Sequence, residues 1–280
     1  MKSFFDRLNA KLGGERSPAA IGPPELGGAV RFPYGPFRFE TRVAGEANYE
    51  IEATTNLKSW SKLSSGTVKL DLEFVDSDAS KFSYRFYRLR ADGVLSRNVI
   101  GYASVTLPPG FSMVANPLQA TDSRVATLFK EMPDGTTVSR FDTRFHQLTE
   151  NNVQQGKWSN PEEKFEPGEG AIVFNPTSDY KSISFVGEVI QGNFSTPIPA
   201  GFSVRSSPVP QPGRLDTELG FPIDEGDVVH LFDRDKQAYV LYPYDPATWA
   251  RNPPVVSVGE SFWIAKKLGR NWVRNCWLTQ

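Results

Sequence analysis

The chain has one cysteine, two histidines and no long apolar run, and each shortage excludes a class of protein. Cys276 alone cannot form an internal disulfide, and His146 and His230 leave little for a zinc site. No apolar stretch reaches the roughly 18 residues of a membrane-spanning helix, so no membrane insertion is expected. Lysine and arginine number 31 against 32 aspartates and glutamates, a net charge of −1. The chain therefore lacks the basic excess that nucleic acids and anionic membranes select.

What the chain does contain is typical of a folded, β-rich protein. Its 280 residues are 39% hydrophobic and include 20 phenylalanines, which is enough for a sizeable core. The 23 glycines and 22 prolines indicate many turns and few long helices. We expect an all-β fold.

The first 36 residues are predicted to be a docking arm. Residues 3–12 have the pattern of a short amphipathic helix, and their charged residues interrupt any signal peptide. Residues 15–36 are rich in proline and glycine and form an extended strap. The arm is either disordered or binds a neighbouring subunit or another protein. Its candidate partner-binding residues are the apolar ones, Phe4, Phe5, Leu8 and Leu12.

Residues 37–97 are predicted to form a small β-sandwich of the immunoglobulin or fibronectin type III kind. Residues 37–43, 49–53, 68–75 and 84–90 alternate apolar and polar side chains, as strands with one buried face do. Four or more short antiparallel strands within about 65 residues are typical of that sandwich.

An internal duplication occupies the rest of the chain. Displaced by 91 positions, Gly110-Phe111-Ser112 falls on Gly201-Phe202-Ser203, and Phe141-Asp142 falls on Phe232-Asp233. About fifteen identities gather at this one gapless displacement, nearly all at glycine, proline, aromatic or turn positions. We infer two copies of one structural unit.

Each copy is predicted to be a β-rich repeat of about 90 residues with one short helix. The copies occupy residues 98–188 and 189–280. Apolar residues at helical spacing place the helix at residues 125–132 in the first copy and 215–219 in the second. The sequence leaves open whether the copies are separate domains or one body with pseudo-twofold symmetry.

Some segments resemble known bacterial modules. Residues 49–60 (YEIEATTNLKSW), 74–80 and 85–88 are similar to a β-sandwich module of large secreted and surface proteins of environmental bacteria. Residues 110–117 (GFSMVANP) and 167–170 resemble uncharacterised bacterial β-proteins. The resemblance implies a spacer, an adhesive surface or an assembly part, and suggests an extracellular or surface location.

The N-terminus departs from that resemblance because no export signal is visible in it. Three alternatives remain: a shortened chain, an unconventional export route, or a part assembled inside the cell, as for a virion, an injection apparatus or a filament. The sequence does not choose among these compartments.

The residues offer little for catalysis. A serine nucleophile needs a base, and His146 and His230 occupy different positions in the two copies. Residues 259–263 (GESFW) imitate the start of a nucleophile elbow, but Trp263 stands where its second glycine belongs. We expect no enzyme activity and no cofactor.

Acidic residues are better explained by turns than by chemistry. Glu162, Glu163, Glu166 and Glu169 form a cluster that could supply a glycosidase pair. Only Glu169 recurs in the second copy, as Glu260, and turn chemistry survives duplication more readily than a catalytic pair. Asp142 and Asp233 are expected to form Asx-turns. Asp76 with Asp78, and Asp233 with Asp235, are weak calcium candidates that lack the rest of a calcium loop.

Aromatic residues give the remaining candidate site. Trp158 and Trp249 are expected to fill the cores of the repeats; the alternative is an exposed shelf that binds a sugar ring or a protein. The residues of this candidate glycan or partner surface are Trp158, Trp249, Tyr242 and Tyr244.

The sequence therefore predicts a non-enzymatic structural protein that assembles with itself or with protein partners through β-domain surfaces and the arm. The alternative is a carbohydrate-binding module.

Overall fold

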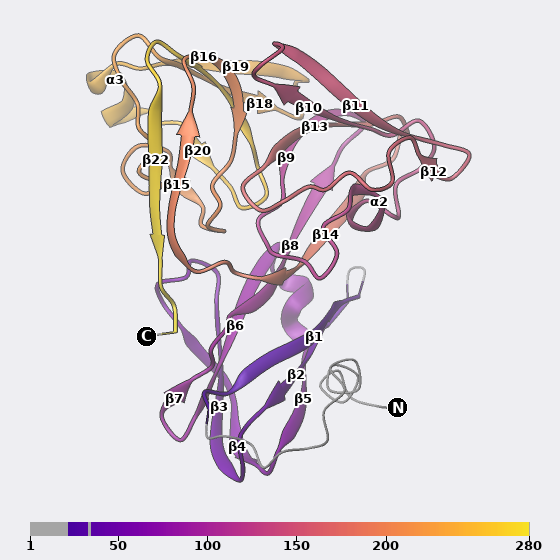
Figure 1. Ribbon diagram of the computed structural model, residues 1–280, viewed down its shortest axis with the longest axis vertical. Helices are drawn as coiled ribbons and strands as arrows, with labels where there is room; N and C mark the ends of the chain where they lie inside the picture. The colour runs from indigo at the N-terminus through magenta and orange to yellow at the C-terminus, as the bar shows by residue number, and fades with distance from the viewer. Residues whose placement is uncertain (1–21, 33–34, 280) are drawn as a thin grey trace. The chain divides into compact units, whose positions relative to one another are not determined.

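The computed structural model describes residues 22–32 and 35–279, which fold mainly as β-strands and confirm the all-β class (Figure 1). The chain divides into two compact units. The first comprises Met1–Ala103, Val186–Val189 and Trp277–Gln280, and the second comprises Ser104–Phe185 and Ile190–Cys276.

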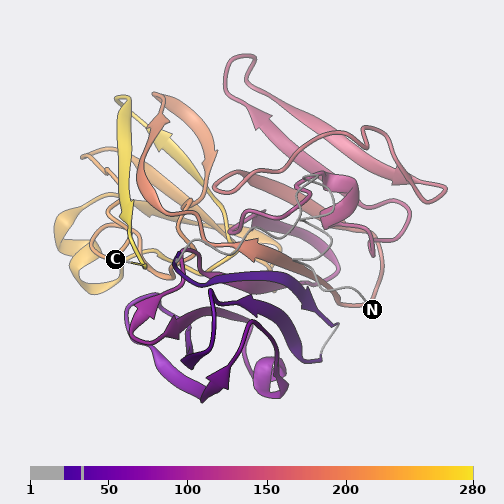
Figure 2. The ribbon, with the colours of Figure 1, turned by 60° about the horizontal axis from the view of Figure 1, so that its bottom comes forward.

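Two sheets of the first unit share one hydrophobic core (Figure 2). Leu26 and Phe39 enter this core from one sheet, and Ile51 and Leu89 enter it from the other. The smaller sheet has the order β1 (Glu25–Arg31), β2 (Phe37–Arg42) and β5 (Asp71–Asp76). The larger sheet has the order β8 (Ile100–Leu107), β6 (Tyr84–Ala91), β3 (Ala47–Thr54) and β4 (Ser61–Val68), with β7 (Val94–Leu95) paired to β6. Most of β14 (Lys181–Glu188) belongs to the second unit.

The predicted strand over residues 68–75 is wrong, because two strands occupy this stretch. β4 ends at Val68 and pairs with β3, whereas β5 begins at Asp71 and pairs with β2. Leu70, 41% exposed, lies at the crossing from one sheet to the other. Alternation continues through that crossing, so the period alone could not locate it.

The predicted arm is too long. Its residues 25–31 form β1, and Leu26 is buried in the core. The amide of Asn98 accepts a hydrogen bond from the Leu26 N–H at 3.0 Å and donates one to the Leu26 carbonyl at 2.8 Å. These bonds and the buried leucine make β1 part of the first unit. The predicted helix with Phe4, Phe5, Leu8 and Leu12 lies outside the described residues.

A buried ion pair stabilises the first unit. Asp76 accepts hydrogen bonds from Arg85 and from the Tyr87 hydroxyl, both at 2.7 Å. Burial, together with the neighbouring Asp76, raises the pKa of Tyr87 far above its usual value, so the phenol stays a neutral donor. The carboxylate thus has partners for the charge it brings into the core.

The second unit contains two larger sheets; we call residues 104–185 the first half of this unit and residues 190–276 its second half. The first has the order β12 (Lys157–Trp158), β11 (Gln147–Gln154), β10 (Thr137–Asp142), β13 (Gly170–Asn175) and β9 (Gly110–Ala115). The second has the order β16 (Gly201–Arg205), β21 (Phe262–Lys266), β18 (Val228–Asp233) and β19 (Ala238–Pro243). Two-stranded sheets pair β15 (Gly192–Ile198) with β22 (Arg270–Cys276), and β17 (Gly213–Arg214) with β20 (Val255–Val256).

Every residue pair between strands of the second sheet matches a pair of the first sheet, with both residue numbers increased by 91. Gly110 lies opposite Asn175 in β9 and β13, and Gly201 lies opposite Lys266 in β16 and β21. Glycines stand where the backbone φ is positive in both halves, which only glycine adopts without strain. These pairs are Gly110 and Gly201, Gly135 and Gly226, and Gly168 and Gly259.

The two halves differ in their helices. The first has α2 (Val125–Leu128), within the predicted range. In the second, residues 215–219 form a turn and not the predicted helix, because Gly213 and Gly220 enclose too few residues. Its helix is α3 (Pro246–Arg251), which begins at Asp245, whose carboxylate accepts a hydrogen bond from the Thr248 N–H at 2.7 Å.

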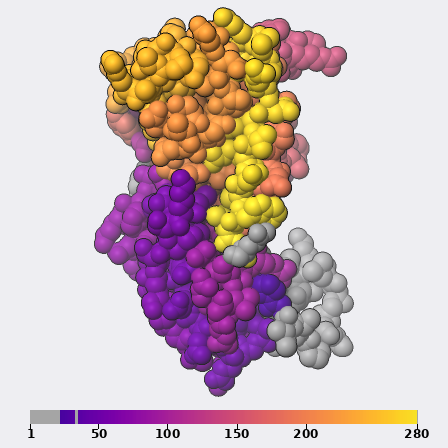
Figure 3. Space-filling view, turned by 90° about the vertical axis from the view of Figure 1, so that its left-hand side faces the viewer, coloured from indigo at the N-terminus to yellow at the C-terminus, as the bar shows by residue number. Residues whose placement is uncertain are grey.

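Each half has its own hydrophobic core, yet both belong to one compact unit. On the face drawn in Figure 3, the second half, in orange and yellow, forms most of the second unit's surface. Among the described residues, no helix is long and apolar enough to cross a membrane.

Candidate functional site: an aromatic face on the second sheet

The second sheet has one face packed on the core of the second half, and its opposite face carries aromatic rings. Along β18 and β21, Val229, Phe262 and Ile264 point into the core. Because side chains alternate along a strand, the residues between them point to the opposite side. That side, the aromatic face, is formed by Phe202, His230, Phe232, Tyr239 and Trp263.

The rings of the aromatic face contact one another edge to face. Phe202 and His230 have ring centroids 5.8 Å apart, and Phe232 and Tyr239 have centroids 5.0 Å apart. The Trp263 indole N–H donates a hydrogen bond to the Tyr239 hydroxyl at 3.0 Å. Such edge-to-face pairs fix the rings in place, so the face is preorganised.

The aromatic face is partly open to solvent. Phe202 is 50% exposed and Tyr239 is 39% exposed. Burial lowers the pKa of His230 and raises the pKa of the Tyr239 phenol. Both groups are therefore neutral near pH 7, which suits an apolar or planar partner better than a charged one.

The first half extends the face and is held against the second half. Phe141 of β10 packs edge to face on Trp263, with ring centroids 4.7 Å apart. The Gln237 amide accepts a hydrogen bond from the Phe111 N–H at 2.7 Å and donates one to the Phe111 carbonyl at 3.0 Å. Arg234 donates to the Met113 carbonyl at 3.1 Å. The β18–β19 hairpin tip thereby occupies the free edge of β9.

The candidate surface of Trp158, Trp249, Tyr242 and Tyr244 is not one exposed shelf. Trp249 is 1% exposed, and its indole N–H donates to the Pro243 carbonyl at 3.0 Å. Trp158 is half-buried against Phe129. Tyr242 and Tyr244 are half-buried against the core of the second half. Trp249 thus fills a core as expected, and its ring is closed to a glycan.

The acidic residues serve turns and ion pairs. Glu169 accepts a hydrogen bond from the Glu166 N–H at 2.8 Å, and Glu260 accepts one from the Ser257 N–H at 2.9 Å, three residues back in both cases. Of the rest of the cluster, Glu162 pairs with Arg124.

The Asx-turns are confirmed as well. Asp142 accepts from the N–H groups of Arg144 and Phe145, and Asp233 does so from Asp235 and Lys236. Among residues 22–32 and 35–279, no group of three or more histidine, cysteine, aspartate or glutamate side chains is placed to hold a metal ion.

A buried lysine is the other concentration of charge in the second unit. The Lys266 ammonium is fully buried and contacts the carboxylates of Asp227 and Asp224. It also donates to the Pro222 carbonyl at 2.8 Å, and Arg270 pairs with Asp224 at 2.9 Å. Every donor thus has an acceptor, which is typical of a structural network rather than of a reactive amine.

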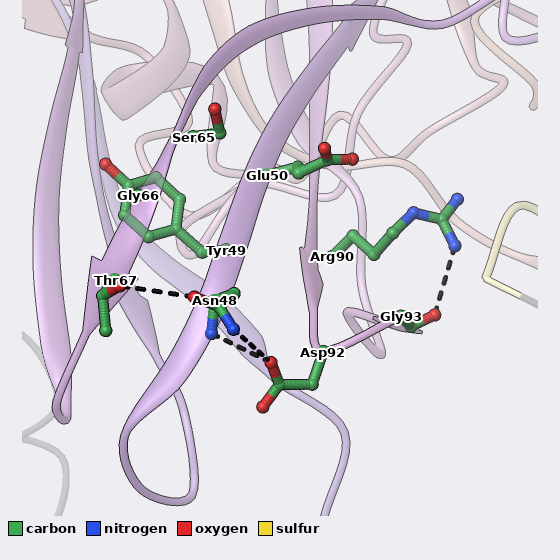
Figure 4. Close-up of a pocket in the computed structure, with 9 residues that line it drawn as sticks. All are labelled: Asn48, Tyr49, Glu50, Ser65, Gly66, Thr67, Arg90, Asp92 and Gly93. Atoms are coloured by element: carbon green, nitrogen blue, oxygen red, sulfur yellow. Dashed lines mark hydrogen bonds between the residues drawn. The ribbon is translucent and has the colours of Figure 1, made fainter.

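A depression of about 430 Å³ lies on the first unit at one end of β3, β4 and β6 (Figure 4). Three of its polar residues are bonded to one another: Asp92 accepts from the Asn48 N–H at 3.0 Å, and Thr67 donates to Asn48. Tyr49 lies against Gly66 on the neighbouring strand. These groups already hold the hairpins together, which leaves little polar capacity for a ligand.

Sequence reasoning missed the aromatic face. The signal is present in the sequence at His230, Phe232 and Tyr239, whose positions alternate with core positions along their strands. Comparison with known proteins adds no relative: no family model, no curated protein and no solved structure matches the chain.

Proposed function

We propose that this chain is a non-enzymatic structural protein that assembles with protein partners through its β-domain surfaces. The single observation that carries the proposal is the aromatic face, which is preorganised, uncharged and partly exposed. Aromatic residues of this kind are enriched where proteins bind one another. The N-terminal arm with Phe4, Phe5, Leu8 and Leu12 is a second contact in this proposal.

Two finer features of the architecture belong to the same proposal. The first unit is an immunoglobulin-like or fibronectin-like sandwich, supported by its two sheets around one core. The second unit arose by tandem duplication, supported by equal strand registers 91 residues apart. Modules of this kind in bacterial surface proteins, filaments and virions act as spacers and assembly parts, which is the role proposed for this chain.

The test is whether the chain belongs to a larger protein complex in an extract of the cells that produce it. Mild crosslinking of an extract, followed by native separation, should place the chain in a stoichiometric complex larger than a dimer. A variant with Phe202→Ser and Tyr239→Ser should leave that complex, whereas Phe145→Ser, at an exposed ring on the β10–β11 hairpin tip, should stay in it. A chain that runs alone in the extract would overturn the proposal.

The alternative function is carbohydrate binding through the same face. The hydrogen-bonded pair of Trp263 and Tyr239 presents a planar apolar surface with a polar edge, which suits a sugar ring. A glycan array with the purified chain tests this alternative. Retention of one glycan class that is lost in Tyr239→Ser would favour carbohydrate over protein as the ligand.

A further inference from the structure

β19 is the last strand of its sheet, and its outer edge is unpaired within the described residues. Pro243 lies opposite Val228 and has no N–H to donate, while the Tyr244 N–H donates to the Asp227 carbonyl. Hydrogen-bonded and non-hydrogen-bonded pairs alternate along an antiparallel ladder. Tyr239 and Leu241 therefore direct their N–H and carbonyl groups away from β18.

This edge strand is apolar throughout. Residues 238–243 read AYVLYP and contain no charge, and Leu241 is 56% exposed. The equivalent strand of the first half, β11, is polar and carries Glu150 where β19 has Leu241. Part of the β11 edge is also closed, since the Asn152 N–H donates to the Ser159 hydroxyl at 3.1 Å.

Four other strand edges are protected by an amide or a charged side chain. Asn98 occupies the edge of β1 and Gln237 that of β9, each with a side-chain amide. β4 and β5 carry Lys62 and Glu73, and charged residues on an edge strand oppose pairing with another chain. The open, uncharged and apolar edge at β19 therefore differs from the edges of β1, β9, β4 and β5.

We propose that two copies of this chain associate by antiparallel pairing of their β19 strands about a twofold axis at Val240. In this register Tyr239 of one copy pairs with Leu241 of the partner subunit. The backbone N–H of each residue then donates a hydrogen bond to the carbonyl of the other. Apolar residues meet apolar residues at every paired position, so the strand is complementary to itself. The inference rests on the proposed assembly function and names one surface that serves it.

A second copy fits this edge for two reasons on the molecule itself. The open stretch lies between Gln237, at the hairpin turn, and Pro243, so a second copy paired about Val240 overlaps it over its full length. Tyr239 also belongs to the aromatic face, so pairing would join the two aromatic faces into one continuous surface.

The test is the association of the purified full-length chain, measured by sedimentation velocity over a roughly hundredfold range of concentration. The chain should show a monomer–dimer equilibrium. Leu241→Glu gives β19 the residue that β11 carries at Glu150, and we expect it to weaken association about tenfold or more. Because Leu241 is exposed, the variant should fold, which circular dichroism checks.

The matched control is Leu148→Glu, which places the same charge on the β11 edge, where Leu148 is 45% exposed. This variant should associate as the unmodified chain does. Hydrogen exchange gives a second readout: the amides of Tyr239 and Leu241 should become protected as concentration rises, and that of Phe111 should not change.

Three results would each overturn the pairing: a monomer at every concentration, equal association of both glutamate variants, or dimers in which the Tyr239 and Leu241 amides still exchange freely. The outcome is separable from that of the proposed function. If the purified chain forms a dimer but joins no larger complex in the extract, the assembly role is wrong and the β19 pairing stands. If the purified chain is a monomer and the Leu241→Glu variant still enters the larger complex in full, the β19 pairing is wrong and the assembly role stands.

Discussion

At the residue scale, one side-chain amide decides how a strand edge is closed. Gln237 and His146 occupy equivalent positions in the two hairpins, with φ angles of 51° and 52°. The glutamine amide offers a carbonyl and an N–H together, so it matches both backbone groups of Phe111. An imidazole has no such pair of groups side by side, and no bond from His146 to the corresponding Phe202 is found among the described residues.

Replacing this amide gives the first prediction. Gln237→Ala should destabilise the second unit by about 1 kcal/mol, because two hydrogen bonds to Phe111 are lost. Hydrogen exchange at the Phe111 amide should become faster in the same variant. His146→Ala, which makes the same substitution at the same backbone conformation, is the control and should change neither quantity. Equal effects of both variants would contradict the role given to the amide.

The buried tryptophan gives the second prediction. Trp249 is enclosed by the core of the second half, so Trp249→Ala should cost about 3–5 kcal/mol in urea unfolding. Trp158 is only half-buried, and its loss should cost clearly less. A glycan affinity that disappears in Trp249→Ala without loss of stability would be inconsistent with a core role.

At the scale of elements, ion pairs join the end of β21 and the start of β22 to the segment before β18. Arg270, the first residue of β22, and Lys266, the last of β21, both pair with Asp224. The hydrogen bond from Arg270 and then that from Lys266 lower the pKa of Asp224 to about 2. The carboxylate thus remains charged in the folded chain well below the pH at which an unfolded aspartate takes up its proton.

The pH dependence of stability follows as the third prediction. Because the folded pKa lies below the unfolded value of about 3.9, the contribution of Asp224 is complete above pH 4 and is lost as the pH falls towards 2. Asp224→Asn should flatten the fall of the melting temperature between pH 4 and pH 2. Glu225→Gln, at a neighbour for which no ion pair is found in the described chain, should leave the slope as it is.

The helices show how far local pattern reaches at this scale. The spacing of apolar residues in 215–219 predicts a helix, but two flanking glycines leave only a turn there. The sequence of α3 has few apolar residues at helical spacing that would predict a helix. What indicates its beginning is Asp245, an N-cap residue, followed by Pro246 at the first helical position. Periodicity therefore located α2, whose N-cap residue makes no side-chain cap bond, whereas capping chemistry is the signal of α3.

At the scale of the whole molecule, the boundary of the arm matters for any truncation. β1 supplies Leu26 to the core of the first unit, and Asn98 bonds to the backbone of that residue.

Truncation gives the fourth prediction. Removal of residues 1–21 keeps β1 and should reduce assembly, because the proposed contacts Phe4, Phe5, Leu8 and Leu12 are lost. Removal of residues 1–36 takes β1 as well, and it should lower the melting temperature because Leu26 and a row of strand hydrogen bonds are lost. Two truncations that melt alike would argue against β1 as an integral strand.

The sequence alone determined the β class, the 91-residue spacing of matching residues such as Gly110 and Gly201, and the turn roles of residues such as Asp142 and Glu169. These follow from local rules, since alternation, glycine at positive φ and carboxylates bonded to nearby N–H groups act within a few residues. Only the tertiary structure decided that Trp158 is half-buried, that Phe202, Tyr239 and Trp263 share one face, and which strand edges stay open. Those properties depend on strand order and on what packs over each sheet, and residues far apart in the chain set both.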